Sequence, residues 1–241
     1  DIDIIPTFMG AHAVPLEYKN DPESYVNLLC DSIIPEVADQ GIAIFNDVFC
    51  EIGYFNLDQA KRILNKGLEY GLLPRIHADE FSNLGASKLA SNLNIVSADH
   101  LMNIEDDDIK SMADSKTKAV ILPGTTFFLG HSNYAPYHKL KDAGIEIAIA
   151  TDYNPGSCNI QSMVFIITIS SIFMKMDIQD AIYSSTYIPA KLLNVGDEYG
   201  SIEIGKNADI IIWDIYNVIQ IPYKFSTNPI KSVIKSGKFI F

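Results

Sequence analysis

The sequence has few cysteines and few basic residues, and both shortages narrow the classes of protein it can belong to. Its three cysteines, Cys30, Cys50 and Cys158, are an odd number without a Cys-x-x-Cys pair, so we predict buried thiols in a reducing, cytoplasmic compartment. Lysine and arginine total 18 against 30 acidic residues, a net charge of −12. This balance argues against nucleic acid or an anionic membrane surface as a partner.

No secretory signal opens the chain, and no apolar run is long enough and uninterrupted enough to span a membrane. The most apolar stretch, residues 160–176, contains six polar residues and is typical of a buried helix. The chain also lacks an initiating Met and begins inside an apolar run, so we expect it to be a fragment of a longer protein. Hydrophobic residues make up 48% of the 241, enough for a sizeable core.

Strand-like and helix-like segments alternate along most of the chain. Short β-branched apolar runs occur at residues 2–9, 42–50, 73–77, 95–98, 119–122 and 146–150. Stretches with helical spacing separate them, at residues 24–39, 57–70, 84–93, 105–113 and 134–143. Because parallel strands buried on both faces are continuously apolar, this order predicts an α/β fold with a parallel sheet covered by helices.

The last quarter of the chain has a different pattern. Two helical stretches, residues 161–174 and 178–193, follow one another without a strand between them. Three β-like segments then complete the chain, at residues 200–204, 208–213 and 230–241. We therefore predict a barrel domain over residues 1–194 and part of a small β-sandwich over residues 195–241. Six β/α units are two short of a closed (β/α)₈ barrel, so an open six-stranded sheet is the alternative.

Polar residues follow the predicted strands, where parallel-sheet enzymes place their chemistry. His12, His77 and His100 each lie at or just beyond the end of an apolar run, and Asp152 follows the sixth. Histidine and aspartate from different strands are ligands that zinc or iron accepts, and Glu80 is placed to carry a proton over the same opening.

Six segments in this order carry a resemblance to a known family: Gly10-Ala11-His12-Ala13-Val14-Pro15, Asp47-Val48-Phe49-Cys50-Glu51, His77-Ala78-Asp79-Glu80-Phe81, Ser97-Ala98-Asp99-His100-Leu101, Leu122-Pro123-Gly124 and Thr151-Asp152-Tyr153-Asn154-Pro155-Gly156-Ser157. Together they resemble the imidazolonepropionase family of the metal-dependent amidohydrolase superfamily. The segment from Gly200 to Asp209 is similar to the superfamily's return into its small β-sandwich. The resemblance covers nearly the whole chain.

The resemblance implies a TIM-like (β/α)₈ barrel of the amidohydrolase type and hydrolysis of the cyclic amide of 4-imidazolone-5-propanoate to N-formimino-L-glutamate, in histidine degradation. It implies one divalent or trivalent metal ion, Zn or Fe, held by His77 and Asp152, with Glu80 and His100 acting beside Asp152 as catalytic groups. It also implies a homodimer. The residues expected to bind the substrate are His12, Glu80, Asn154, Gly156 and Ser157.

Part of the family's site is missing from this sequence. The family takes two further metal histidines from an H-x-H motif on its first strand, and no H-x-H occurs here. His77 and Asp152 match the ligands of strands five and eight, so the six predicted strands correspond to strands three to eight. We expect ~100 or more additional N-terminal residues, from two β/α units of ~30 residues each and half of the sandwich. A nucleobase deaminase of the same fold and a catalytically incomplete fragment are the alternative interpretations.

Overall fold

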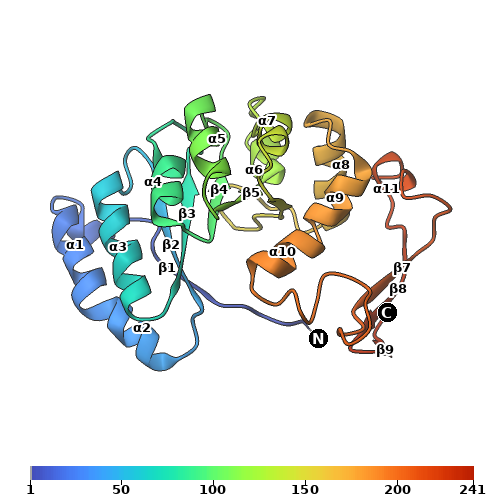
Figure 1. Cartoon of the computed structure of the whole chain (residues 1–241), viewed down its shortest axis with the longest axis horizontal. Coiled ribbons are helices and arrows are strands. Elements are labelled where there is room, and N and C mark those ends of the chain that lie inside the picture. Colours follow the sequence, from blue (N-terminus) through green and yellow to red (C-terminus); the bar gives the residue numbers. More distant parts are fainter. Residues whose placement is uncertain (1) are drawn as a thin grey trace. The chain divides into compact units, whose positions relative to one another are not determined.

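The computed structural model describes residues 2–241, which divide into two compact units. The first unit contains Ile2–Val120 and Lys139–Ile145, and the second contains Ile121–His138 and Glu146–Phe241. Six strands form one sheet whose order follows the chain (Figure 1). They are β1 (Thr7–Ala11), β2 (Phe45–Cys50), β3 (Leu73–Ala78), β4 (Ser97–His100), β5 (Lys118–Ile121) and β6 (Ile147–Ile149). The pairs from β1 to β5 are all parallel.

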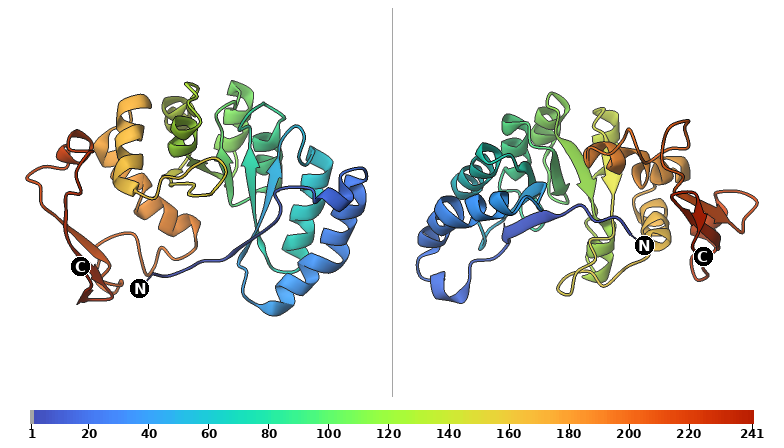
Figure 2. Two further views of the ribbon diagram at one scale, coloured as in Figure 1. Left: turned by 180° about the vertical axis from the view of Figure 1, so that it is seen from behind. Right: turned by 90° about the horizontal axis from the view of Figure 1, so that it is seen from below.

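Helices of the first unit lie together on one side of its strands (Figures 1 and 2). Helix α3 packs against β2 and β3, and helix α4 packs against β3 and β4. On the helix-covered side of β2, Asn46 Nδ2 donates to the carbonyl of Ile63 in α3 at 3.0 Å. The helical elements of the first unit are η1 (Leu16–Tyr18), α1 (Pro22–Leu28), the π-helical segment η2 (Leu29–Ile33), α2 (Ile34–Gln40), α3 (Leu57–Glu69), α4 (Ala86–Leu93) and α5 (Asp106–Ala113). Helix α7 (Tyr137–Asp142) begins in the second unit and ends in the first.

Local sequence signals explain where these elements begin and which way their side chains point. A capping box starts α3, because Asn56 Oδ1 accepts from the Gln59 amide at 3.0 Å and Gln59 Oε1 accepts from the Asn56 amide at 3.1 Å. Along β3, Ile76 and Ala78 are fully buried. Arg75 and His77 alternate with them, so they lie on the opposite face of the sheet from the helices. That face carries the candidate site.

The second unit contains five further helices and a small antiparallel sheet. The sheet is formed by β7 (Ile210–Trp213), β8 (Ile230–Lys235) and β9 (Lys238–Phe239), in that order. The helices are α6 (Pro123–Phe128), α8 (Met163–Phe173), α9 (Ile178–Ser184), α10 (Tyr187–Leu192) and α11 (Gln220–Tyr223). Among residues 2–241, no helix combines the length and the apolar character that crossing a bilayer would require.

The predicted α/β organisation is confirmed, because all six predicted parallel strands and every predicted helix have a counterpart. Two predicted helices are interrupted. The stretch at residues 24–39 passes through the π-helical segment Leu29–Ile33. The stretch at residues 178–193 breaks between α9 and α10, where Pro189 lies in the first turn of the second helix, the part of a helix that tolerates proline.

The predicted strand at residues 200–204 is wrong, since this segment is a turn. Gly200 and Gly205 have φ values of +93° and +96°, which lie outside the extended range of a regular strand. The ammonium of Lys206 holds the turn, because its Nζ donates to the Gly196 carbonyl at 2.6 Å and to Ser201 Oγ at 2.7 Å. The prediction failed because hydrogen bonds between separate parts of the chain determine this turn, and the pattern of apolar residues contains no information about them.

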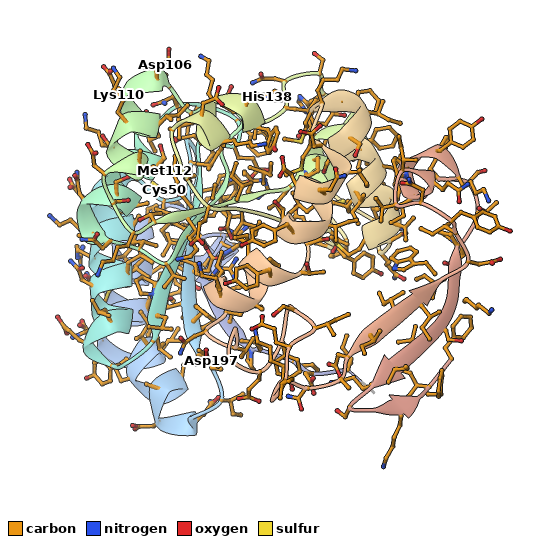
Figure 3. All side chains as sticks on the ribbon, turned by 45° about the vertical axis from the view of Figure 1, so that its right-hand side comes forward. Cys50, Asp106, Lys110, Met112, His138 and Asp197 are labelled. Atoms are coloured by element: carbon orange, nitrogen blue, oxygen red, sulfur yellow. The ribbon has the colours of Figure 1, made fainter. Side chains whose placement is uncertain are left out.

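The three cysteines provide a direct test of this packing. Cys50 is 1% exposed on β2, inside the protein, whereas Asp106 and Lys110 lie on the outer part of α5 (Figure 3). Burial, together with the charges of Asp79 and Glu51, raises the pKa of the Cys50 thiol to about 12. Cys30 and Cys158 are also buried, with free thiols whose pKa is raised by burial.

We therefore expect the folded protein to resist iodoacetamide at pH 8, because only a thiolate is an efficient nucleophile and Cys50 stays protonated well above that pH. Mass spectrometry should find all three thiols unmodified until a denaturant is added, after which all three react. Rapid modification of Cys50 in the folded protein would contradict its placement on the buried side of β2.

Candidate metal centre

The first unit brings two predicted site residues, His12 and His77, together around a third residue, Asp47, that was given no role from the sequence. His77, at the end of β3, places its Nδ1 3.0 Å from Oδ1 of Asp47 in β2. His12, just after β1, has its Nε2 3.6 Å from the same oxygen. One ligand atom from each of His12, Asp47 and His77 lies within 4.8 Å of the others. The three strands β1, β2 and β3 therefore present a group of nitrogen and oxygen donors.

The electrostatics of this group are dominated by Asp47, which is 3% exposed. Its burial favours the neutral acid, but the charge of His77 and the interactions with His77 and His12 hold the pKa of the carboxyl well below its usual range. Burial lowers the pKa of His77, yet the charge and hydrogen bond of Asp47 outweigh that effect and raise the pKa to about 9. Nδ1 of His77 therefore lies against a carboxylate that stays charged.

His100, at the end of β4, lies beside this pair although strand alternation would place it elsewhere. It is in register with Ala78, which faces the helices, yet its ring centre is 4.9 Å from that of His77. The left-handed backbone at His100 (φ +77°) and Leu101 (φ +63°) marks the point where the alternation ends. Burial and the charge of His77 lower the pKa of His100 well below its ordinary value, so its imidazole is neutral.

Glu80 follows β3, and its Oε2 lies 3.5 Å from Nε2 of His100. Both side chains are almost fully buried, at 5% and 2% exposure for the residues. The carbonyl of Glu80 accepts from Asn103 Nδ2 at 2.7 Å, so the Glu80 loop is tied to the loop after β4. The first unit therefore holds a carboxylate and a neutral imidazole side by side, and either group can transfer a proton.

Glu51, the last residue of the Asp47-Val48-Phe49-Cys50-Glu51 segment, anchors the same loop. Its carboxylate accepts from the amides of Phe81 and Ser82 at 2.9 and 3.1 Å, and from the Ser82 hydroxyl. It also accepts from the amide of Ile52 at 2.8 Å. The sequence analysis gave this residue no role, because its partners are thirty positions away in the chain and no local pattern reveals them.

Replacing Glu51 should therefore weaken the loop that carries Glu80. Glu51→Gln leaves one acceptor oxygen where the carboxylate has two, so we expect the free energy of unfolding to fall by about 1–3 kcal/mol, the cost of buried donors without partners. Denaturant titration measures this change. Glu69→Gln, on an exposed carboxylate of α3, is the matched control and should leave the stability unchanged. Equal stability of the two variants would contradict the anchoring role.

Arg75, two residues before His77 on β3, forms an ion pair with Asp99 of β4. Arg75 Nη2 donates to Asp99 Oδ2 at 2.8 Å, and Arg75 Nε donates to Ser97 Oγ at 3.1 Å. The guanidinium also lies 5.6 Å from the ring centre of Phe45. The hydrogen bonds of Arg75 thus go to β4, while the contacts of Asp47 go to the two histidines.

The remaining predicted residues lie in the second unit, on the loop after β6. Asp152 has a left-handed backbone (φ +52°), and its Oδ2 accepts from the hydroxyl of Thr125. Asn154 Oδ1 accepts from the amides of Gly156 and Ser157 at 2.9 and 2.7 Å, while its Nδ2 donates to the Asp152 carbonyl at 2.7 Å. The amide of Asn154 therefore shapes the loop around Asp152.

Gly124, in the Leu122-Pro123-Gly124 segment, explains why α6 can begin against this loop. A Cβ at this position would lie 2.7 Å from Ile166 Cδ1, 3.1 Å from Cys158 Sγ and 3.2 Å from the Thr151 carbonyl. Only glycine leaves room for the three. The next residue of the helix, Thr125, then reaches Asp152.

The donors of the first unit fit a metal ion. Nε2 of His12 is buried and forms no hydrogen bond within residues 2–241. The same is true of Nδ1 of His100. Buried imidazole nitrogens without partners, next to a buried carboxylate, are costly unless a ligand completes them. Imidazole and carboxylate are also the donor types that zinc and iron accept.

The comparisons with known proteins agree with this fold. Residues 97–240 match the Amidohydrolase family, so the chain belongs to the amidohydrolase family. The chain is 42% identical over 238 residues to an imidazolonepropionase of Alkaliphilus metalliredigens (strain QYMF), covering 99% of this chain and 56% of that protein. It is 44% identical over 239 residues to an imidazolonepropionase of Geobacillus kaustophilus (strain HTA426), again over 99% of this chain and 56% of the relative. The chain thus spans little more than half the length of these curated relatives.

Solved structures with low sequence identity share the fold. A 5-methylcytosine deaminase from Klebsiella pneumoniae liganded with 5-fluorocytosine superposes with a TM-score of 0.77 at 16% identity, covering 100% of this chain and 63% of that one. An adenosine deaminase from Xanthomonas campestris with bound zinc gives a TM-score of 0.71 at 20% identity, over 87% of this chain and 55% of that one. These likenesses confirm the predicted amidohydrolase-type α/β fold.

Proposed function

We propose that this chain is the greater part of an imidazolonepropionase, which hydrolyses the cyclic amide of 4-imidazolone-5-propanoate to N-formimino-L-glutamate in histidine degradation. The observation that carries the proposal is the 42% identity to an imidazolonepropionase over 99% of the chain. The segments around His12, His77, Asp152 and their neighbours point to the same substrate. A homodimer and a cytoplasmic location stay predictions.

His77 and Asp152 are the residues that we propose as ligands of one metal ion, zinc or iron. Support for His77 comes from its position among imidazole and carboxylate donors in the first unit. Support for Asp152 comes from its match to the family segment and from the Thr125 hydroxyl, which fixes the carboxylate. When bound, such an ion lowers the pKa of a water molecule to ~7 and so makes hydroxide available at neutral pH.

Glu80 is the proposed proton carrier. The water oxygen bonds to the ring carbonyl carbon, the carbon–nitrogen bond of the cyclic amide breaks, and the proton taken by Glu80 passes to the leaving ring nitrogen. His100, 3.5 Å from Glu80 and held neutral by burial, donates a hydrogen bond to the carbonyl oxygen as negative charge develops on it. Asp152, on the loop after β6, is proposed to assist this proton transfer in addition to its role as a metal ligand.

Four more residues are proposed to hold the substrate. His12 offers the buried Nε2 that forms no hydrogen bond within the described residues. Asn154, Gly156 and Ser157 belong to the loop that follows Asp152, where the Asn154 side chain already orders the backbone. The side-chain amide of Asn154 is already hydrogen-bonded to the loop backbone. Asn154 therefore contributes by shaping the binding surface that Gly156 and Ser157 present.

The catalytically incomplete fragment is the second candidate, and one observation favours it. The chain covers 56% of the length of its relative and contains no H-x-H motif, so two of the three expected histidine ligands are not in it. The deaminase alternative has no comparable support, because the similarity to solved deaminases is at or below 20% identity and shows the fold alone.

The test is a ring-opening assay on this chain and on the chain preceded by the N-terminal part of a related imidazolonepropionase. Formation of N-formimino-L-glutamate is followed by mass spectrometry, with and without a chelator. We expect metal-dependent turnover in the longer protein, and turnover by the short chain as well would exclude the incomplete fragment. Release of ammonia from a nucleobase with no ring opening would contradict the proposal.

A further inference from the structure

We propose that Asp47 is a positioning residue that holds the ring of His77 in one orientation and one protonation pattern, with Nδ1 protonated and Nε2 free to bind the metal ion. The inference rests on the proposed function, in which His77 is a ligand. It goes beyond that function because neither the resemblance nor the comparisons give Asp47 a role. The observation behind it is the 3.0 Å contact between Asp47 Oδ1 and His77 Nδ1.

The sheet register fixes the relation between the two side chains. Asp47 is in register with Arg75, and Phe49 is in register with His77. Asp47 therefore lies on the same face of the sheet as His77, on the neighbouring strand and two residues before the position opposite it. The ring of Phe49 lies 5.8 Å from that of His77, and the ring of His12 lies 4.5 Å from it, both edge to face. His77 is therefore held by rings around it and by a single acceptor at Nδ1.

That acceptor determines which nitrogen can act as a ligand. A carboxylate accepts and does not donate, so the proton of the neutral imidazole resides on Nδ1 and the lone pair is left on Nε2. A carboxylate behind a metal-binding histidine also increases the basicity of the ligand nitrogen. Asp47 thus supplies both the orientation and the electronic effect without touching the ion.

The surroundings of Asp47 explain why a carboxylate occurs in the middle of a buried strand, where an unpaired charge is costly. The neighbouring guanidinium of Arg75 donates to Asp99 and Ser97. Within residues 2–241, Asp47 contacts two histidines, His77 at 3.0 Å and His12 at 3.6 Å, and the contact with His77 is the one within hydrogen-bond distance. The geometry therefore matches a hydrogen-bonded partner of His77.

The experiment measures zinc affinity and the ring protonation of His77 in the full-length protein. For Asp47→Ala we expect a 10–100-fold loss of zinc affinity in competition with a chelator, the usual effect of removing such a partner. Asp47→Asn keeps an acceptor oxygen of the same shape, so it should recover part of that loss. Asp108→Asn removes another buried carboxylate, hydrogen-bonded to Asn83 on the helix side, and should bind zinc like the parent protein.

Nitrogen-15 NMR of the zinc-loaded parent protein gives a second reading that does not depend on any variant folding. We expect a proton coupled to Nδ1 of His77 and a metal-shifted Nε2. Zinc on Nδ1 would overturn the inference and make Asp47 a ligand. Unchanged zinc affinity in a folded Asp47→Ala variant would also overturn the positioning role of Asp47. If His77→Ala still loses zinc affinity in that case, the proposed ligand role of His77 stands. Unchanged zinc affinity in both variants would contradict the positioning role and the ligand role together.

Discussion

Replacing Glu80 with glutamine should lower the turnover number for ring opening about 10²–10⁴-fold, which is the range for removing a general acid–base group. The amide has nearly the shape of the carboxylate, so the contact with His100 and the loop anchored by Glu51 should persist. What disappears is the ability to take a proton from water and return it to the leaving nitrogen. The substrate concentration at half-maximal rate should change little.

The control for this prediction separates chemistry from stability. Glu105→Gln, at the exposed start of α5, should leave turnover unchanged. Metal content should be equal in the parent protein and in Glu80→Gln, because Glu80 is not a proposed ligand. A Glu80→Gln variant with near-parent turnover would show that another group carries the proton, and the assignment would be wrong.

Replacing His77 with alanine should have the second large effect, on metal content and activity together. The variant loses a nitrogen ligand and leaves the Asp47 carboxylate buried without its hydrogen-bond partner. Metal-ion chemistry is worth several kcal/mol of transition-state stabilisation, so we expect turnover to fall at least about 100-fold. Elemental analysis of the purified variant should find the metal content reduced in parallel.

His138→Ala is the matched control, because His138 lies on the exposed side of α7 and has no site role (Figure 3). It should keep the parent metal content and turnover. Asp108→Asn provides a stability control, since it also disturbs a buried carboxylate of the first unit. Full metal content in a folded His77→Ala variant would remove His77 from the ligand set.

The parallel strands could be predicted from the sequence because they are continuously apolar and are separated by helices that end at glycine. Gly41, for example, ends α2 with a φ of +65°. Elements whose form depends on distant partners could not be predicted. The turn around Gly200 needs the Lys206 ammonium, and α6 needs the space that Gly124 leaves beside the Asp152 loop.

The candidate site divides in the same way. His77 and His100 could be found because each lies at the end of a strand. Asp47 could not be assigned a role, because it sits inside a buried strand and its importance comes from a neighbour thirty residues away. A carboxylate within such an apolar run is the signal that could have identified it. The predicted domain boundary near residue 194 and the proposed ligand pair stay predictions.

The most direct test of the central claim is a crystal structure of the zinc-loaded, full-length protein with anomalous diffraction at the zinc edge. The account predicts one zinc ion with a nitrogen of His77 and an oxygen of Asp152 each at about 2.0–2.2 Å from it. An ion bound elsewhere, or bound by His77 with Asp152 too far away to reach it, would contradict the claim that these two residues share one metal.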